Sequence, residues 1–188
     1  MLLQKQNGDV FEGDMKQGEK NGYGCFTTQK GFQYKGEFID NQMNGQGIYI
    51  VNDNYVYEGS FKNGSINGQG KCIWQNGKQY QGEWLNNKMN GQGQLLFLNG
   101  KKYIGNFYED LFDGYGEFFW ENENIYKGNW KKGQMNGEGI LIQKNNQTIQ
   151  GLWIDGQYQW NENTEYSKSS LEESKQSQQA ILNHKDNI

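Results

Sequence analysis

Large side chains recur along the chain in pairs that enclose a glycine, with one polar residue on either side of that glycine. The segment Tyr80-Gln81-Gly82-Glu83-Trp84 is the clearest example. Alternation with a period of two residues is typical of a β-strand, so both rings and the glycine share one face of the strand. The polar residues then face water on the other side.

This pattern repeats with a constant period. The central glycines are Gly13, Gly36, Gly59, Gly82, Gly105, Gly128 and Gly151, always 23 residues apart. The flanking ring pairs of the inner units are Tyr34 and Phe38, Tyr57 and Phe61, Tyr80 and Trp84, Tyr103 and Phe107, and Tyr126 and Trp130. Six full repeats fill residues 11–148, and partial units at both ends extend the predicted array to residues 1–160. A fixed period of this length indicates a repeat array.

A turn signal follows each ring pair. Asn-Gly or Asp-Gly places a glycine at Gly22, Gly45, Gly68, Gly91, Gly114 and Gly137. Such dipeptides favour tight hairpin turns because both residues tolerate positive φ. A second glycine follows two residues later and opens the return strand, at Gly24, Gly47, Gly70, Gly93, Gly116 and Gly139. Each repeat is therefore predicted to be one β-hairpin, and further turns are expected at Gly77 and Gly100.

Stacked hairpins predict an all-β fold, an elongated single-layer antiparallel sheet. A lone hairpin is marginally stable in water, whereas stacking buries each ring pair against its neighbours. Rings can lie flat on their own sheet only where a neighbouring position has no side chain. Replacing Gly82 or Gly105 is therefore expected to cost more than replacing a leucine. The last unit carries Trp160 and Glu162 where the later glycines would stand, which predicts a terminal cap.

Composition supports a core of rings rather than of aliphatic chains. Leu, Ile, Val and Phe make up 37 of 188 residues, near the level of disordered chains, yet 28 residues are aromatic, 27 are glycine and none is proline. The net charge is −4, and all 18 basic residues are lysine. Without arginine or a basic surplus, we expect no nucleic-acid partner.

The repeat contains no arrangement of residues that is typical of a catalytic or metal site. Cys25 and Cys72 hold almost equivalent places two repeats apart, too far for a disulfide, and the one histidine, His184, lies near the end of the chain. Repeated acids such as Glu37 and Glu83 are interpreted as solvated strand positions. We therefore expect no enzyme, no cofactor and no metal site.

Two sets of apolar residues are candidates for partner binding. Met43, Ile66, Met89, Phe112 and Met135 precede the Asn-Gly or Asp-Gly pairs and form a stripe along one edge. Packing beneath the turns is the favoured interpretation of this stripe, and an adaptable binding surface is the alternative. Trp74 and Trp120 lie far along the return strands, where partial exposure would make them anchors for a partner.

The segments Tyr34-Lys35-Gly36-Glu37-Phe38 and Asn44-Gly45-Gln46-Gly47, with their counterparts, resemble the MORN repeat (membrane occupation and recognition nexus). The resemblance covers residues 11 to about 156. It implies a non-catalytic scaffold that binds other proteins, and similarity to MORN-only proteins suggests a ciliary axonemal or cytoskeletal assembly. The alternative implied by the family is a phosphoinositide-binding membrane tether, although this chain lacks the clusters of basic residues that such binding uses.

The 23-residue pattern does not continue into residues 161–188. Ser170-Leu171-Glu172-Glu173 resembles a capping box, so a short helix over residues 171–183 is predicted within a polar tail. It would dock on the sheet, dock on a partner, or fray. No apolar stretch is long enough for a bilayer span or a secretory leader, so a cytoplasmic setting is expected. An open sheet edge at the first residues allows end-to-end self-association.

Overall fold

The computed structural model describes residues 2–4 and 8–160, and fifteen strands cover most of this part. The strands are β1 (Leu2–Gln4), β2 (Val10–Lys16), β3 (Glu19–Thr27), β4 (Phe32–Ile39), β5 (Gln42–Val51), β6 (Tyr55–Lys62), β7 (Ser65–Trp74), β8 (Gln79–Leu85), β9 (Lys88–Leu96), β10 (Lys102–Tyr108), β11 (Leu111–Phe119), β12 (Ile125–Lys131), β13 (Gln134–Ile142), β14 (Thr148–Ile154) and β15 (Gln157–Tyr158). One 3₁₀ turn, η1 (Asn52–Asn54), joins β5 to β6.

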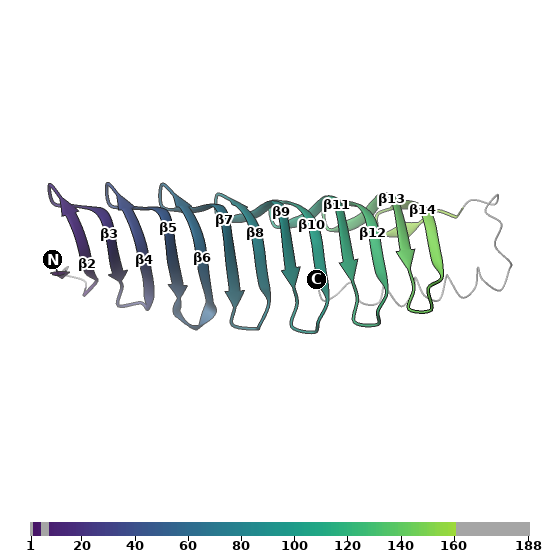
Figure 1. Ribbon diagram of the computed structural model, residues 1–188, viewed down its shortest axis with the longest axis horizontal. Coiled ribbons are helices and arrows are strands. Elements are labelled where there is room, and N and C mark those ends of the chain that lie inside the picture. Colours follow the sequence, from purple (N-terminus) through teal and green to yellow (C-terminus); the bar gives the residue numbers. More distant parts are fainter. Residues whose placement is uncertain (1, 5–7, 161–188) are drawn as a thin grey trace.

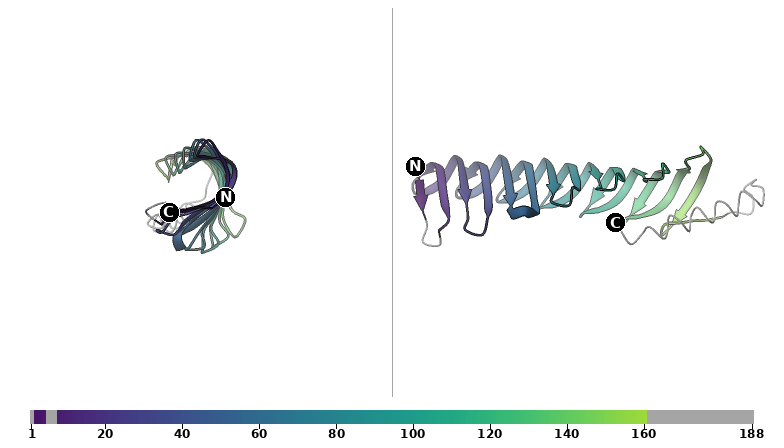
Figure 2. Two further views of the ribbon diagram at one scale, coloured as in Figure 1. Left: turned by 90° about the vertical axis from the view of Figure 1, so that its left-hand side faces the viewer. Right: turned by 90° about the horizontal axis from the view of Figure 1, so that it is seen from below.

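All fifteen strands belong to one antiparallel sheet in which they follow one another in sequence order (Figure 1). The predicted all-β fold with a single open sheet is confirmed. The predicted helix over residues 171–183 lies outside the described residues. Seen end-on, the sheet is bent into an open trough, not the flat surface that a simple stack of hairpins would give (Figure 2).

The strand pairing of each full repeat contains an irregularity. In the hairpin of β8 and β9, Gly82 pairs with Gly93, and the next pair is Trp84 with Met89. One residue of β8, Glu83, therefore faces three residues of β9, and such a bulge bends and twists a strand. Glu83 bridges the gap, because its Oε1 accepts a hydrogen bond from the backbone N–H of Gln92 at 3.0 Å. Glu83 is exposed, as expected of a solvated strand position, and its carboxylate also spans the bulge.

The hairpin tips lie elsewhere than predicted. Asn90-Gly91 sits inside β9, at the bulge, whereas the tip is formed by Asn86 and Asn87, with φ of 50° and 67°. The equivalent tips are residues 17–18, 40–41, 63–64, 109–110, 132–133 and 155–156, all with positive φ. The Asn-Gly signal correctly marked a positive φ, since Gly91 has φ of 71°. The prediction that Asn-Gly forms the hairpin turn was wrong. Asn, Asp and several other residues also adopt positive φ, and such residues form the two-residue tips here.

Each tip from residues 40–41 onward is hydrogen-bonded to the preceding repeat. The backbone N–H of Asn87 donates to the carbonyl of Ile66 at 3.0 Å, and the side-chain Oδ1 of Asn87 accepts from the N–H of Ile66 at 2.8 Å. The asparagine of the preceding Asn-Gly pair adds a third bond, from Asn67 Nδ2 to Asn86 Oδ1 at 3.4 Å. The tips therefore form a polar seam that fixes one repeat against the next.

Aromatic rings form a second, apolar seam on the inner face of the trough. Tyr80 makes an edge contact with Trp84 of its own repeat and another with Phe107 of the next, each with 5.0 Å between ring centroids. Contacts of this kind are favourable beyond the burial of the rings. They link fourteen rings without a break, in the order Phe11, Phe38, Tyr34, Phe61, Tyr57, Trp84, Tyr80, Phe107, Tyr103, Trp130, Tyr126, Trp153, Tyr158 and Trp160.

Glycines make room for these rings. A Cβ added at Gly82 would lie 2.5 Å from Gly93 Cα and 2.6 Å from the Tyr80 hydroxyl, and one added at Gly93 would lie 2.5 Å from Tyr80 Cε2. The ring of Tyr80 is fully buried, and its hydroxyl donates to the carbonyl of Glu83 at 2.8 Å. The tyrosine thus covers both glycines and also binds the backbone beside the bulge.

The last repeat ends the array with a different arrangement. β15 is only two residues long, and its Tyr158 packs on Trp153 with 5.3 Å between ring centroids. A Cβ at Gly151 would lie 2.9 Å from the Tyr158 hydroxyl, so this ring covers a glycine from the following strand instead of from its own. The hydroxyl donates to the carbonyl of Gln150 at 2.9 Å. Tyr158 and Trp160 therefore cover the end of the ring ladder.

Replacing Gly82 by alanine should lower the free energy of unfolding by roughly 3 kcal/mol, because the new methyl group meets backbone atoms that cannot move aside. The matched control is Gly100→Ala, where a Cβ meets nothing within 4 Å but φ is +83°. That change should cost about 1 kcal/mol from the backbone conformation alone. Chemical denaturation of both variants measures the difference. An equal loss of unfolding free energy in the two variants would contradict the close contact of Gly82 with Gly93 and the Tyr80 ring.

Candidate functional site

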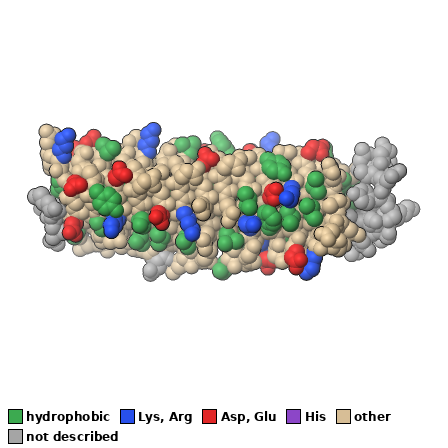
Figure 3. Space-filling model, in the orientation of Figure 1, with side chains coloured by type: hydrophobic (Ala, Val, Ile, Leu, Met, Phe, Trp, Pro, Cys, Tyr) green, Lys and Arg blue, Asp and Glu red, His purple; other side chains and the backbone are tan. Residues whose placement is uncertain are grey.

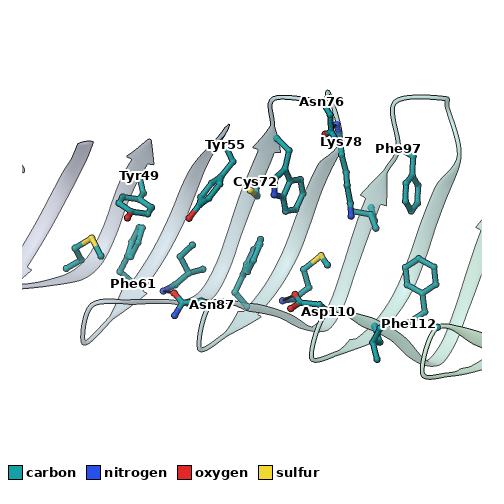
Figure 4. A pocket seen from close by; sticks show the side chains of 18 of the residues that line it. Tyr49, Tyr55, Phe61, Cys72, Asn76, Lys78, Asn87, Phe97, Asp110 and Phe112 are labelled. Atoms are coloured by element: carbon teal, nitrogen blue, oxygen red, sulfur yellow. Dashed lines mark hydrogen bonds between the residues drawn. The ribbon is translucent and has the colours of Figure 1, made fainter. Parts of the chain in front are cut away.

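An elongated groove runs along the inner face of the trough across the middle repeats. Its volume is about 780 Å³. The lining residues are Met43, Tyr49, Tyr55, Phe61, Gly64, Ile66, Cys72, Trp74, Asn76, Lys78, Trp84, Asn87, Met89, Leu95, Phe97, Asp110, Leu111, Phe112 and Gly133 (Figure 4). Rings and apolar side chains form the floor, and the polar side chains lie near the two margins.

One wall of the groove consists of rings beyond the buried ladder. Tyr49, Tyr55, Trp74 and Phe97 are all half-buried, whereas ladder rings such as Tyr57 have no exposed surface. Trp74 occupies the last position of β7, two residues beyond Cys72, so both side chains point inward. The loop after Trp74 is closed by hydrogen bonds from Trp74 N to the Lys78 carbonyl and from Gly77 N to the Trp74 carbonyl, both at 2.9 Å. These rings are held in place yet remain accessible.

Lys78 is the one lysine among the groove-lining residues. Its Nζ lies 5.3 Å from the centroid of a Trp74 ring and 5.5 Å from that of Phe97, within the range of cation–π contacts (Figure 4). Burial lowers the pKa of Lys78, and the nearby charge of Asp110 opposes that shift. The ammonium is therefore held in a partly desolvated, apolar setting.

The opposite margin is lined by residues of the tips. Asp110 Oδ1 accepts a hydrogen bond from the backbone N–H of Met89 at 2.8 Å, in the same way that Asn87 binds Ile66. These side chains are engaged in joining the repeats. Their polar atoms contribute a hydrophilic rim to a groove with an apolar floor, which is the usual composition of a surface that recognises another molecule.

The groove has few groups that could do chemistry. Cys72 is buried and free, and burial raises the pKa of its thiol to about 12, so it is a protonated, unreactive group at neutral pH. Cys25 is also free. Within residues 2–4 and 8–160, no three His, Cys, Asp or Glu side chains gather in a way that could hold a metal ion. The arrangement is suited to binding.

The partner-binding candidates fall into two groups in the structure. Met89, Phe112 and Met135 are buried, at 6%, 4% and 6% exposure, and Met43 is half-buried. Met43, Met89 and Phe112 also line the groove floor.

Trp74 and Trp120 are both half-buried. Trp74 lines the groove, whereas Trp120 is not among its lining residues and lies against Phe118, with 4.7 Å between ring centroids. The groove thus includes one of the two tryptophans, and a role for either in partner binding stays a prediction.

Two lysines with structural importance escaped the sequence analysis. Lys78 belongs to no motif, and only its position directly after the Asn76-Gly77 pair, in the loop that follows Trp74, could have suggested it. Lys20 stands where later repeats have Met43 or Met89, and it is only 8% exposed. Its Nζ lies 4.0 Å from the centroid of the Phe26 ring, so an ammonium on aromatic faces takes the place of a thioether.

The outer face of the trough differs from the groove. It mixes apolar, acidic and basic side chains without a dominant charge (Figure 3). Lys127 Nζ and Glu117 Oε2 form an ion pair of 3.0 Å there, between directly opposed residues of the paired strands β12 and β11. Tyr115 is 55% exposed, and Ile104 and Leu152 are 38% and 43% exposed. These residues are scattered among charges, whereas the groove presents contiguous rings.

The fold defines a class, the β-hairpin repeat proteins built on one uncovered antiparallel sheet. The MORN repeat profile matches six successive segments, residues 11–32, 34–54, 57–79, 80–102, 103–125 and 126–148. The chain belongs to the MORN-repeat family. The resemblance drawn from the repeated glycines and rings is confirmed at this level.

Among solved structures, the fold is similar to the TCP domain of SAS-4 (dCPAP) of Drosophila melanogaster, determined in complex with a proline-rich motif of Ana2 (dSTIL). The similarity has a TM-score of 0.40 at 14% sequence identity and covers 81% of this chain and 89% of that one. Comparison with curated proteins gives no significant match. No helix in the described part of the chain is long and apolar enough to cross a membrane.

The tyrosines beneath the groove should make the fold sensitive to alkali. Burial raises the pKa of Tyr57 to about 12, and it raises the pKa of Tyr34, Tyr80, Tyr103 and Tyr126 further. Because the unfolded chain loses these protons first, near the ordinary pKa of 10.0, the stabilising effect is complete below that pH and is lost as pH rises through the folded values.

We therefore expect the sheet to unfold between pH 10 and about pH 12, with tyrosinate absorbance and loss of the β-sheet circular-dichroism signal rising together. Tyr57→Phe removes one of the titrating groups and should make the dependence on pH shallower. Ionisation of all tyrosines while the sheet signal persists would show that the hydroxyls are not buried as described.

Proposed function

We propose that this protein is a non-catalytic interaction scaffold whose inner groove receives an elongated segment of a partner protein. The observation that carries this proposal is the contiguous row of half-buried rings, Tyr49, Tyr55, Trp74 and Phe97, above a floor of buried ones. Partly exposed Trp and Tyr side chains in a rigid setting are typical anchors of protein interfaces. The array itself holds these rings in place, so binding needs no rearrangement of the sheet.

The shape of the groove favours a polypeptide over a small ligand. It is lined by residues from β5 to the tip at residues 132–133, so it extends across several repeats. An open, elongated surface of this kind suits a helix or an extended chain, which presents side chains at regular intervals. Concave surfaces built from consecutive repeats are the usual binding surfaces of repeat proteins.

We further propose that the partner belongs to a ciliary axonemal or cytoskeletal assembly. Support comes from the resemblance to MORN-only proteins and from the composition. The chain has 24 Asn, 22 Gln and 18 Lys but no Arg or Pro, as expected from an AT-rich genome, and its glutamines fit a ciliated protist that reads some stop codons as Gln.

Proximity labelling in the source cell tests this proposal. The groove variant Trp74→Ala with Phe97→Ala should reduce labelling of the direct partner about tenfold or more, since anchor rings contribute the most to binding. Tyr115→Ala, on the outer face, is the matched control and should leave labelling unchanged. Partners that survive the groove variant would contradict the proposed site. Absence of the protein from isolated axonemes would contradict the setting alone.

The alternative function is a phosphoinositide-binding membrane tether. Lysines in the described part lie among acids, as in the pairs Lys127 with Glu117 and Lys144 with Glu123. Phosphoinositide recognition uses clusters of about four to eight basic residues. We therefore expect the full chain not to float with phosphoinositide-containing vesicles at physiological salt. Flotation that depends on the phosphoinositide would favour the tether over the scaffold.

A further inference from the structure

Lys78 is a partly desolvated charged group that lies near the charge of Asp110 without forming an ion pair with it in the described structure. Its Nζ is half-buried between Trp74 and Phe97, and no hydrogen bond or ion pair to this nitrogen is found among residues 2–4 and 8–160. Most other lysines lie on the surface in water. A partly desolvated ammonium without a hydrogen-bonded anion is unfavourable, and proteins normally pair such a charge.

The neighbours of Lys78 do not fill this role. Asp110 is near enough to influence the Lys78 pKa, but its Oδ1 is bound to the Met89 amide and it forms no ion pair with Lys78 within the described structure. Cys72 is protonated at neutral pH because burial raises the pKa of its thiol to about 12. The rings of Trp74 and Phe97 offer their faces, which stabilise a cation only in part.

Lys78 is the one lysine that lines the groove, although it occupies a repeated position. The positions one repeat before and one repeat after it hold Tyr55 and Lys101. Tyr55 is a ring of the groove wall, and Lys101 is only 5% exposed and does not line the groove. A single cation therefore stands in an otherwise apolar row, where it can set the register of a bound segment.

We propose that the groove recognises a segment of another protein in which one Asp or Glu carboxylate, flanked by apolar side chains, pairs with Lys78. The apolar residues would lie on Phe97, Trp74 and the floor, and the carboxylate would accept a charge-assisted hydrogen bond from Nζ. This inference rests on the proposed function, because it names the chemistry of the segment that the groove receives. Charge complementarity of this kind selects partners and fixes their orientation.

The test is a selection from a random peptide-display library on the full-length protein. The wild type should enrich peptides with an acidic residue among aliphatic or aromatic ones. Lys78→Met should enrich apolar peptides without the acid, and Lys78→Glu should favour Lys or Arg at the same place. Lys71→Glu is the matched control, since Lys71 is exposed on β7 and its side chain points to the face opposite Cys72.

An enriched wild-type peptide should bind Lys78→Glu at least about 10-fold more weakly and Lys71→Glu with unchanged affinity, because removing one partner of a desolvated pair leaves the other charge buried and unpaired. Groove binders that carry no acid would overturn the inference and leave the proposed function standing. A failure of every arm to enrich groove binders would overturn the proposed function itself.

The chain's own segment 161–188 contains acids near apolar residues, so it is tested as a competing occupant. A full-length variant with Glu172→Lys and Glu173→Lys removes that acidic pair. The proposal expects the same peptides to be selected by this variant and by the wild type. If this variant enriched acidic peptides and the wild type did not, the chain's own acidic segment would be the occupant of the groove. That result would overturn recognition of an outside partner.

Discussion

The structure depends on one steric constraint, the contact of a buried ring with glycines on two neighbouring strands. Tyr80 shows it most clearly, because its ring lies over Gly82 and Gly93 and its hydroxyl binds the carbonyl of Glu83. A sheet without a covering layer has no other element to bury its inner face. The rings therefore lie flat and contact one another across repeats. They bury the inner face of the sheet, as a second layer does in a sandwich. Proline is absent from a chain that must pair almost every strand on both sides.

The shape of the protein follows from what happens beside those glycines. One residue of the first strand faces three residues of the second, as with Glu83 opposite the segment containing Gly91 and Gln92. Because the irregularity recurs at the same place in every full repeat, the bends add into a trough instead of cancelling. In the trough, the hairpin tips lie along one margin of the groove, and the loops at the far ends of the return strands lie along the other (Figure 4). The groove is thus a consequence of the same local feature that was first noticed as an Asn-Gly signal.

Much of this architecture could be predicted from the sequence, and the failures have identifiable causes. The 23-residue spacing determined the strands, the shared face of Tyr80 and Trp84, and the reason for Gly82, since period and sterics act locally. The tips were misplaced because positive φ is a property of a residue and not of a turn, and Asn86 with Asn87 provides it as well as Asn90 with Gly91. Curvature could not be predicted, because it depends on how many residues face one another across two strands.

The groove was hidden for a further reason, which also bears on specificity. A regular array presents the same surface in every repeat, and a partner could bind it in several registers with nearly equal affinity. Only departures from the repeat can distinguish one register from the next. Lys78 is such a departure, since its counterparts are Tyr55 and a buried Lys101, and Cys72 is another, since its counterparts include Tyr49 and Leu95. Periodicity shows how this chain folds, and the residues that break the period determine what can bind to it and where.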